Sequence, residues 1–197
     1  MLGLKNNMIK ITDDFLDIKD YNGLNELHTE YASVHWYGAG CSPKNSLHKL
    51  IASTHYSWMN YGHKLHYSEK LSGATAWYNI RPIDPQWHND IDIYCTQNGV
   101  KHAPKKLPKY TFLYYMRSPD SGGELELETG DLIQPLTNRL VRFPCNIPHR
   151  VRPYTGNRVS IGIIWWYDIP KIYGDLSEKD MKVLPRVWEI EDERAAV

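Results

Sequence analysis

The hydrophobic and polar positions of the chain follow two different periods, one before and one after about residue 73. In residues 21–32 and 42–62, apolar side chains recur at helical spacing. A short alternating run over residues 8–17 comes before them and predicts an edge strand that leads into a turn. We therefore expect the first part of the chain, about residues 1–73, to be mostly a helical support.

From residue 74 onward, the pattern is that of short strands separated by turns containing proline and glycine. The candidate strands cover residues 74–80, 88–94, 110–117, 123–128, 139–144, 149–154 and 158–167. Short strands of this kind behind a helical layer are typical of a barrel-like sandwich. The predicted fold class is mainly β with flanking N-terminal helices (α+β), with a jelly-roll core over about residues 74–170 and a tail over about 171–197.

Length and charge narrow the classes of protein further. A chain of 197 residues suits one hydrophobic core, so we expect a single domain over residues 1–197. The formal net charge is zero, which removes the long-range field that nucleic-acid binders use. No run approaches the roughly 20 apolar residues that cross a bilayer, and the N-terminal residues lack the apolar core of a signal peptide. These features predict a cytoplasmic protein with neither nucleic-acid nor membrane partners.

The cysteines support the same location. Cys41, Cys95 and Cys145 are far apart and form no CxxC pair. They predict neither a disulfide framework nor a zinc–thiolate site, and they suit a reducing compartment.

One long segment of the strand region has no apolar periodicity. Residues 95–110 contain four lysines, two prolines and one glycine. A connection of this length is either functional or simply mobile surface. It follows shortly after His88 and Asp90, two residues that could bind a metal ion, so we keep both interpretations, a lid over such a site and a solvated loop.

Three residues could together hold a metal ion. His88 and Asp90 stand two positions apart on a predicted strand, so their side chains can point to the same face and chelate one ion. A single pair of this kind is more often a chance surface feature, but His149 follows a proline at the start of a later strand. Two histidines and one carboxylate form the facial triad that holds ferrous iron and leaves coordination positions open.

An anion-binding pair lies close behind the second histidine. Arg158 and Ser160 also stand two positions apart, on the strand face opposite to Val159, Ile161 and the apolar residues that follow. A guanidinium inside a barrel is costly unless it meets an anion, and its planar fork fits a carboxylate. The pair therefore predicts a dicarboxylate held by the metal at one end and by Arg158 at the other.

These residues resemble a known family. The pattern of His88 and Asp90, then His149, then Arg158 with Ser160, is similar to that of the 2-oxoglutarate and Fe(II)-dependent oxygenases, in their prolyl 4-hydroxylase-like branch. The resemblance spans residues 74–168 and includes the runs YTFLYYMRSPDSGGELEL and NRLVRFPCNIPHRV between the ligands.

The resemblance implies a double-stranded β-helix core, Fe(II), 2-oxoglutarate as co-substrate and O2, with ascorbate as a candidate reductant. By position, it also implies that Tyr78 and Tyr115 assist at 2-oxoglutarate, with Tyr114 as an alternative to Tyr115. The sequence departs from the family in two places. Collagen-type enzymes carry lysine where Arg158 stands, and some relatives carry a larger side chain at Gly162, so the resemblance does not define the substrate side of the pocket.

The resemblance implies hydroxylation of an unactivated C–H bond. Related halogenases replace the carboxylate at Asp90 with a small residue, so its presence favours hydroxylation. We expect a prolyl 4-hydroxylase-like enzyme that acts on a peptide or protein, with a hydroxylase of a free amino acid or small metabolite as the alternative. A non-enzymatic cupin-like binder would not need Arg158 and Ser160, and a nucleic-acid demethylase would carry a second arginine where Ile164 stands.

Overall fold

The computed structural model describes residues 9–27, 35–38, 42–59, 71, 73–79, 86–90 and 108–167. The predicted C-terminal tail lies outside these ranges, and so does the predicted loop apart from residues 108–110. Whether that loop acts as a lid therefore stays a prediction.

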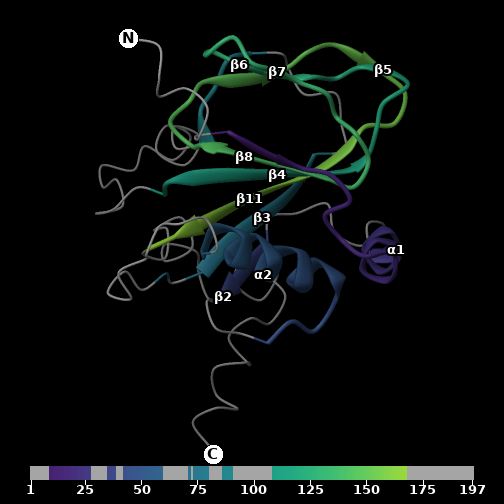
Figure 1. Ribbon diagram of the computed structural model, residues 1–197, viewed down its shortest axis with the longest axis vertical. Helices are drawn as coiled ribbons and strands as arrows, with labels where there is room; N and C mark the ends of the chain where they lie inside the picture. Colours follow the sequence, from purple (N-terminus) through teal and green to yellow (C-terminus); the bar gives the residue numbers. More distant parts are fainter. Residues whose placement is uncertain are drawn as a thin grey trace, which may run out of the picture.

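A six-stranded antiparallel sheet forms the main layer (Figure 1). Its strands, in spatial order, are β1 (Lys10–Thr12), β8 (Arg139–Pro144), β4 (Tyr110–Arg117), β11 (Val159–Trp166), β3 (Gly73–Asn79) and β2 (His35–Gly38). The expected edge strand near the N-terminus is confirmed by β1, which pairs only with β8 among the described strands. β2 is missing from the sequence-based prediction because four residues are too few to show a period.

Shorter strands build a second layer above the main sheet (Figure 1). They are β7 (Leu132–Ile133), β6 (Leu125–Leu127) and β9 (His149–Val151) in one sheet, and β5 (Ser121–Gly122) with β10 (Tyr154–Thr155) in a ribbon. The predicted strand over residues 149–154 is thus two strands, and Pro153, which has no N–H to donate, lies between them. A second small hydrophobic core, including Leu125 and Phe143, lies between the two layers.

Two helices cover the opposite face of the main sheet: α1 (Ile18–Leu27) and α2 (Ser46–Met59) (Figure 1). Leu24 and Leu50 from these helices are fully buried in one cluster with Ile161 and Ile163 of β11. This confirms that alternate residues of the last strand face the helices. Neither described helix is long and apolar enough to cross a membrane, and the predicted location in the cytoplasm stays a prediction.

The expected strand over residues 88–94 is wrong in the part that the structure describes. His88 makes only an isolated antiparallel bridge with His149, and Asp90 already has helical conformation. The ladder stops there for a local reason. The next residues opposite are Pro148, which has no N–H, and Ile147, whose N–H is bonded to another carbonyl.

Two histidines of α2 determine part of the response of stability to pH. Burial lowers the pKa of His48, which packs against Tyr37, and Lys44 adds to this effect. Burial likewise lowers the pKa of His55, which packs against Trp165. As the pH falls through 6.5, the ordinary pKa of histidine, these two side chains therefore bind protons in the unfolded chain more readily than in the folded protein.

We predict that the free energy of unfolding decreases as the pH falls through 6.5, the ordinary pKa of these two side chains. Urea unfolding at a series of pH values measures this slope. A His48→Gln, His55→Gln double variant should show a shallower slope, whatever its stability at neutral pH. An unchanged slope in that variant would assign the pH dependence to other groups.

Candidate active site

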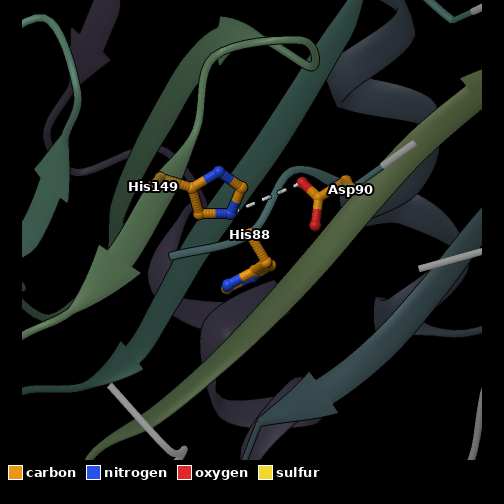
Figure 2. A group of neighbouring side chains, drawn as sticks. All are labelled: His88, Asp90 and His149. Carbon is orange, nitrogen blue, oxygen red and sulfur yellow. Dashed lines mark ion pairs between the residues drawn. The ribbon is translucent and has the colours of Figure 1, made fainter. Parts of the chain in front are cut away.

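Three side chains from distant parts of the sequence converge at one end of the space between the two layers. Ligand atoms of His88, Asp90 and His149 all lie within 4.8 Å of one another. His149 Nε2 is 3.7 Å from Asp90 Oδ2, and Figure 2 shows these two side chains directed at each other with His88 beside them. Two imidazoles and one carboxylate with ligand atoms this close together can hold a divalent metal.

Backbone contacts hold the two histidines together. His88 N donates to His149 O at 3.1 Å, and His149 N donates to His88 O at 2.8 Å. On the outer side of this bridge, the Trp87 ring packs against the guanidinium of Arg150 at 4.7 Å, and Arg150 in turn pairs with Glu126 at 2.8 Å. The short segment that carries His88 is thus held to β9 by two backbone hydrogen bonds and by the contact between Trp87 and Arg150.

The ring nitrogens of both histidines are oriented alike. His88 Nδ1 lies 3.1 Å from the carbonyl oxygen of Gln86, and His149 Nδ1 lies 3.1 Å from that of Ile147. Each carbonyl can accept a hydrogen bond only if Nδ1 carries the proton, which leaves Nε2 free as a ligand. Burial lowers the pKa of His149, which favours the neutral ring, and Phe143 packs against that ring with the centroids 4.8 Å apart.

The carboxylate of the triad is buried and has a dedicated hydrogen-bond donor. Asp90 is only 3% exposed, and Thr111 Oγ1 of β4 donates to its Oδ2 at 2.6 Å. One neutral hydrogen bond does not offset the cost of burying a negative charge, whereas a bound cation would. Thr111 therefore acts as a positioning residue that orients Asp90 toward the histidines.

We predict that Thr111→Val weakens binding of a divalent metal by about 10-fold or more, because an unrestrained ligand carboxylate loses its orientation. Isothermal titration with Mn2+ measures the affinity. Thr54→Val is the matched control, since Thr54 is an equally buried threonine that accepts a hydrogen bond from Trp165 on the helix side of the sheet. Equal affinities in wild type and Thr111→Val would remove this positioning role.

A positive group lies at the other end of the same space. Arg158 is only 2% exposed, its Nε donates to Gly123 O at 3.2 Å and its Nη1 donates to Ser160 Oγ at 3.1 Å. Its Nη2 is buried and has no hydrogen-bond partner among the residues that the structure describes. The strands thus place a charged donor in the interior with part of its capacity unused.

A tyrosine hydroxyl supplements this unused donor. The Tyr115 ring lies 5.1 Å from the Arg158 guanidinium carbon, and within the described part of the chain its buried hydroxyl makes no hydrogen bond of normal geometry. Burial raises the pKa of Tyr115, and the nearby guanidinium opposes this rise only in part. The hydroxyl is therefore protonated, and together with Arg158 it offers two donors to an incoming carboxylate.

Two glycines, one at the end of β5 and one directly after it, leave room for the arginine side chain. Gly122 and Gly123 have φ values of +69° and +75°, in the left-handed region that favours glycine. A Cβ at Gly123 would lie 3.1 Å from Arg158 Cδ and 3.0 Å from Pro119 Cγ. The absence of a side chain at Gly123 thus leaves room for Arg158, whose Nε donates to the Gly123 carbonyl.

Two neighbouring tyrosines of β4 point to opposite faces, which decides between them. Tyr115 pairs in register with Ser160 and faces the space between the layers. Tyr114 faces the helices, and its hydroxyl donates to Asn138 Oδ1 at 2.9 Å. Tyr115 is accordingly the one of the two that lies beside Arg158.

The structure does not bring Tyr78 to this site. Tyr78 pairs with Ile161 on the helix face of the sheet and is buried in the cluster beneath the helices. Its neighbour Asn79 pairs with Ser160 and lines the pocket instead. A role for Tyr78 at 2-oxoglutarate is therefore not supported by its placement. Neighbouring residues of a strand point to opposite faces, so Asn79 lines the cavity where Tyr78 does not.

One cavity of about 170 Å3 joins the triad and the arginine. It is lined by Trp77, Asn79, His88, Asp90, Thr111, Leu113, Leu125, Phe143, His149, Val151 and Arg158. Sequence reasoning missed Asn79, Thr111 and Trp77. The alternation within β3 could have indicated two of them, because the small residues Ala74 and Ala76 mark its helix-facing side.

Part of the chain matches the model of a known protein family. A family model described as the 2OG-Fe(II) oxygenase superfamily matches residues 77–167, which include all of the side chains described at both ends of the cavity. No curated protein sequence matches the chain.

Solved structures supply a fold. The chain is similar to a viral collagen prolyl hydroxylase from Paramecium Bursaria Chlorella virus-1, with a TM-score of 0.59 and 16% identity over 81% of this chain and 89% of that chain. A Pseudomonas putida prolyl-4-hydroxylase gives a TM-score of 0.58 and 15% identity, covering 80% and 85%. A Trichoplax adhaerens prolyl hydroxylase, in complex with a hypoxia inducible factor oxygen degradation domain peptide fragment, gives 0.56 and 19%, covering 83% and 85%. These similarities confirm the predicted double-stranded β-helix.

Proposed function

Because a family model described as the 2OG-Fe(II) oxygenase superfamily matches residues 77–167, we propose that the chain is a member of this superfamily and that it hydroxylates a proline residue within a peptide or protein. It is an oxygenase whose cofactors are Fe(II), 2-oxoglutarate and O2. The observation that carries the proposal is the single cavity with a potential metal triad at one end and a buried, incompletely bonded arginine at the other.

The triad residues fit the role of iron ligands. His88 and His149 would each present Nε2 and Asp90 a carboxylate oxygen, and three protein ligands leave positions free for the co-substrate and oxygen. When bound, the iron supplies the oxidative chemistry that converts substrate C–H, O2 and 2-oxoglutarate into substrate C–OH, succinate and CO2. The protein contributes ligand orientation, through the Gln86 and Ile147 carbonyls.

The arginine end fits a carboxylate. Arg158 Nη2 and the Tyr115 hydroxyl are buried donors with no normal hydrogen-bond partner, and Ser160 lies against the same guanidinium. We propose that these three residues hold the distal carboxylate of 2-oxoglutarate. The charge of a buried guanidinium and that of a carboxylate then offset each other, with the charge-assisted hydrogen bonds that such pairs form.

The character of the cavity favours a peptide over a free amino acid. A free amino acid needs counter-charges for both its ammonium and its carboxylate. Apart from the histidines, the described lining residues include one cation, Arg158, and one carboxylate, Asp90, and both are committed to the co-substrate and the metal. The prolyl hydroxylases with similar folds include one solved with a peptide fragment. A prolyl residue within a peptide carries no charge, so it suits the uncharged side chains that line the rest of the cavity.

The test has two stages. Anaerobic titration of iron-loaded protein with 2-oxoglutarate should give the visible charge-transfer band of a chelated 2-oxo acid. Aerobic incubation with a pool of capped peptides that contain a central proline, and separately with free L-proline, is then followed by mass spectrometry. Hydroxylated peptide with stoichiometric succinate is the expected result. Hydroxylation of free L-proline alone would select the small-metabolite alternative, and the absence of the band would overturn the proposal.

A further inference from the structure

Three rows of side chains cross the cavity face of the main sheet, because registered residues of neighbouring strands point to the same side. Each row takes one residue from β4, β11 and β3. Along β11, the rows are Tyr115–Ser160–Asn79, then Leu113–Gly162–Trp77, then Thr111–Ile164–Thr75. The first row lies at the arginine and the third at the metal triad, since Thr111 donates to Asp90. The middle row therefore lies between the two ends of the site.

A dicarboxylate bound at both ends of the cavity would run along β4, because both ends contact this strand. The Arg158 guanidinium lies over Tyr115 of β4, and its Nε is bonded to Gly123 just before β6. Asp90 at the other end is bonded to a residue of β4 as well. The residues between them on this side are Leu113 and Leu125, whose apolar side chains suit the methylene groups of 2-oxoglutarate. The side of the cavity next to β3 is left for the primary substrate.

A tryptophan forms the floor of that side, and a glycine makes room for it. A Cβ at Gly162 would lie 2.3 Å from both Cε2 and Cζ2 of Trp77, so the indole rests directly on the glycine backbone. Trp77 is half-buried and lines the cavity with His88 and Asp90. Among the contacts of the described residues, its indole N–H has no hydrogen-bond acceptor.

We propose that Trp77, seated on Gly162, is the residue against which the primary substrate packs, and that its indole N–H donates a hydrogen bond to a backbone carbonyl of a substrate peptide. The inference rests on the proposed function and names the substrate side of the same site. The indole N–H is a donor only, so it selects an acceptor. A prolyl residue presents an apolar ring with a carbonyl next to it, and this combination matches an indole face and edge.

Substitutions of Trp77 separate the two contributions. Trp77→Phe keeps an aromatic ring but removes the donor, and we expect KM for the peptide to rise about 3- to 10-fold with kcat nearly unchanged. Trp77→Ala removes the packing surface too, and we expect kcat/KM to fall by about 30-fold or more. The affinity for 2-oxoglutarate should stay within about twofold of wild type in both, because the co-substrate lies on the β4 side.

Gly162 provides the matched test. Gly162→Ala forces the indole to move, so its kcat/KM should fall as it does for a Trp77 substitution. In a Trp77→Ala background, the same change meets no indole and should add little further loss. Tyr78→Phe is the control on the same strand, since Tyr78 faces the helices.

The experiment compares these variants by two measurements: the charge-transfer band during titration with 2-oxoglutarate, and hydroxylation of the pool of capped proline peptides. An intact band with weaker peptide turnover in the Trp77 and Gly162→Ala variants supports the proposal. An intact band with wild-type KM in Trp77→Phe and Trp77→Ala overturns it, as does a band lost in these variants alone, which would assign Trp77 to the co-substrate. No hydroxylation of the pool by wild type that forms the band overturns the peptide assignment. Absence of the band in wild type means instead that the proposed function has failed.

Discussion

Arg158→Gln is expected to reduce the affinity for 2-oxoglutarate by at least about 100-fold, because a buried charge-assisted pair is replaced by a neutral contact. The arginine is 2% exposed, so bulk water cannot solvate the carboxylate of 2-oxoglutarate in place of the lost guanidinium. Glutamine is chosen because its amide can still donate to the Gly123 carbonyl that the arginine uses. Anaerobic titration of the iron-loaded variant, followed by the charge-transfer band, measures the effect.

A second substitution at Arg158 separates charge from geometry. Arg158→Lys keeps the positive charge but loses the planar fork that bonds Gly123 and Ser160 at once, and we expect an affinity about 10-fold or more below wild type. Both variants should retain binding of Mn2+, because none of the triad residues is altered, and this retention shows that they are folded. An affinity for 2-oxoglutarate close to that of wild type in Arg158→Gln would contradict the assignment of this residue.

Asp90→Asn is expected to abolish stabilisation by a divalent metal. Wild type should gain about 2.7 kcal/mol in free energy of unfolding at a metal concentration 100 times its Kd, and the variant should gain close to nothing. Asparagine is nearly isosteric and its amide oxygen can still accept the hydrogen bond from Thr111. In the metal-free state, the variant should be as stable as wild type or more stable, because it no longer buries an uncompensated charge.

Thermal or urea unfolding with and without Mn2+ measures both parts of this prediction. Glu128→Gln serves as the control, because Glu128 is an exposed carboxylate outside the cavity. Loss of metal stabilisation with unchanged metal-free stability would establish Asp90 as a ligand rather than a structural residue. If Asp90→Asn unfolds more easily without metal but still gains stability from it, then the carboxylate is part of the fold and the metal lies elsewhere.

Local patterns predicted the architecture where the period was long enough to count. The alternation in β11 separated Ile161, which faces the helices, from Ser160, which faces the cavity, because burial of one face imposes the period directly on the sequence. Strands of two to four residues, such as β2 and β7, carry too few positions to show any period. These strands form because a neighbouring strand offers backbone groups with which they can pair. The residues of the short segment alone do not reveal that neighbour.

The candidate site shows the same division. Side-chain type and spacing alone singled out His88, Asp90, His149 and Arg158, since few combinations of residues suit a metal and a carboxylate together. The strand proposed to carry the first two is nevertheless wrong. Their side chains converge because His88 bridges His149 and Thr111 holds Asp90. These are contacts between segments, and no property of residues 88–94 by themselves reveals them.

By itself, the sequence determined which chemical groups are present: the triad, the arginine with its serine, and the periods that place most of them on strands. Only the tertiary structure decided which face of a strand each neighbour takes, so that Asn79 and Tyr115 line the cavity while Tyr78 and Tyr114 pack beneath the helices. The physical reason is that a strand exchanges its faces with every one-residue shift in register. Register is set by hydrogen bonds and packing between strands far apart in the chain, as is the room that Gly162 leaves for Trp77.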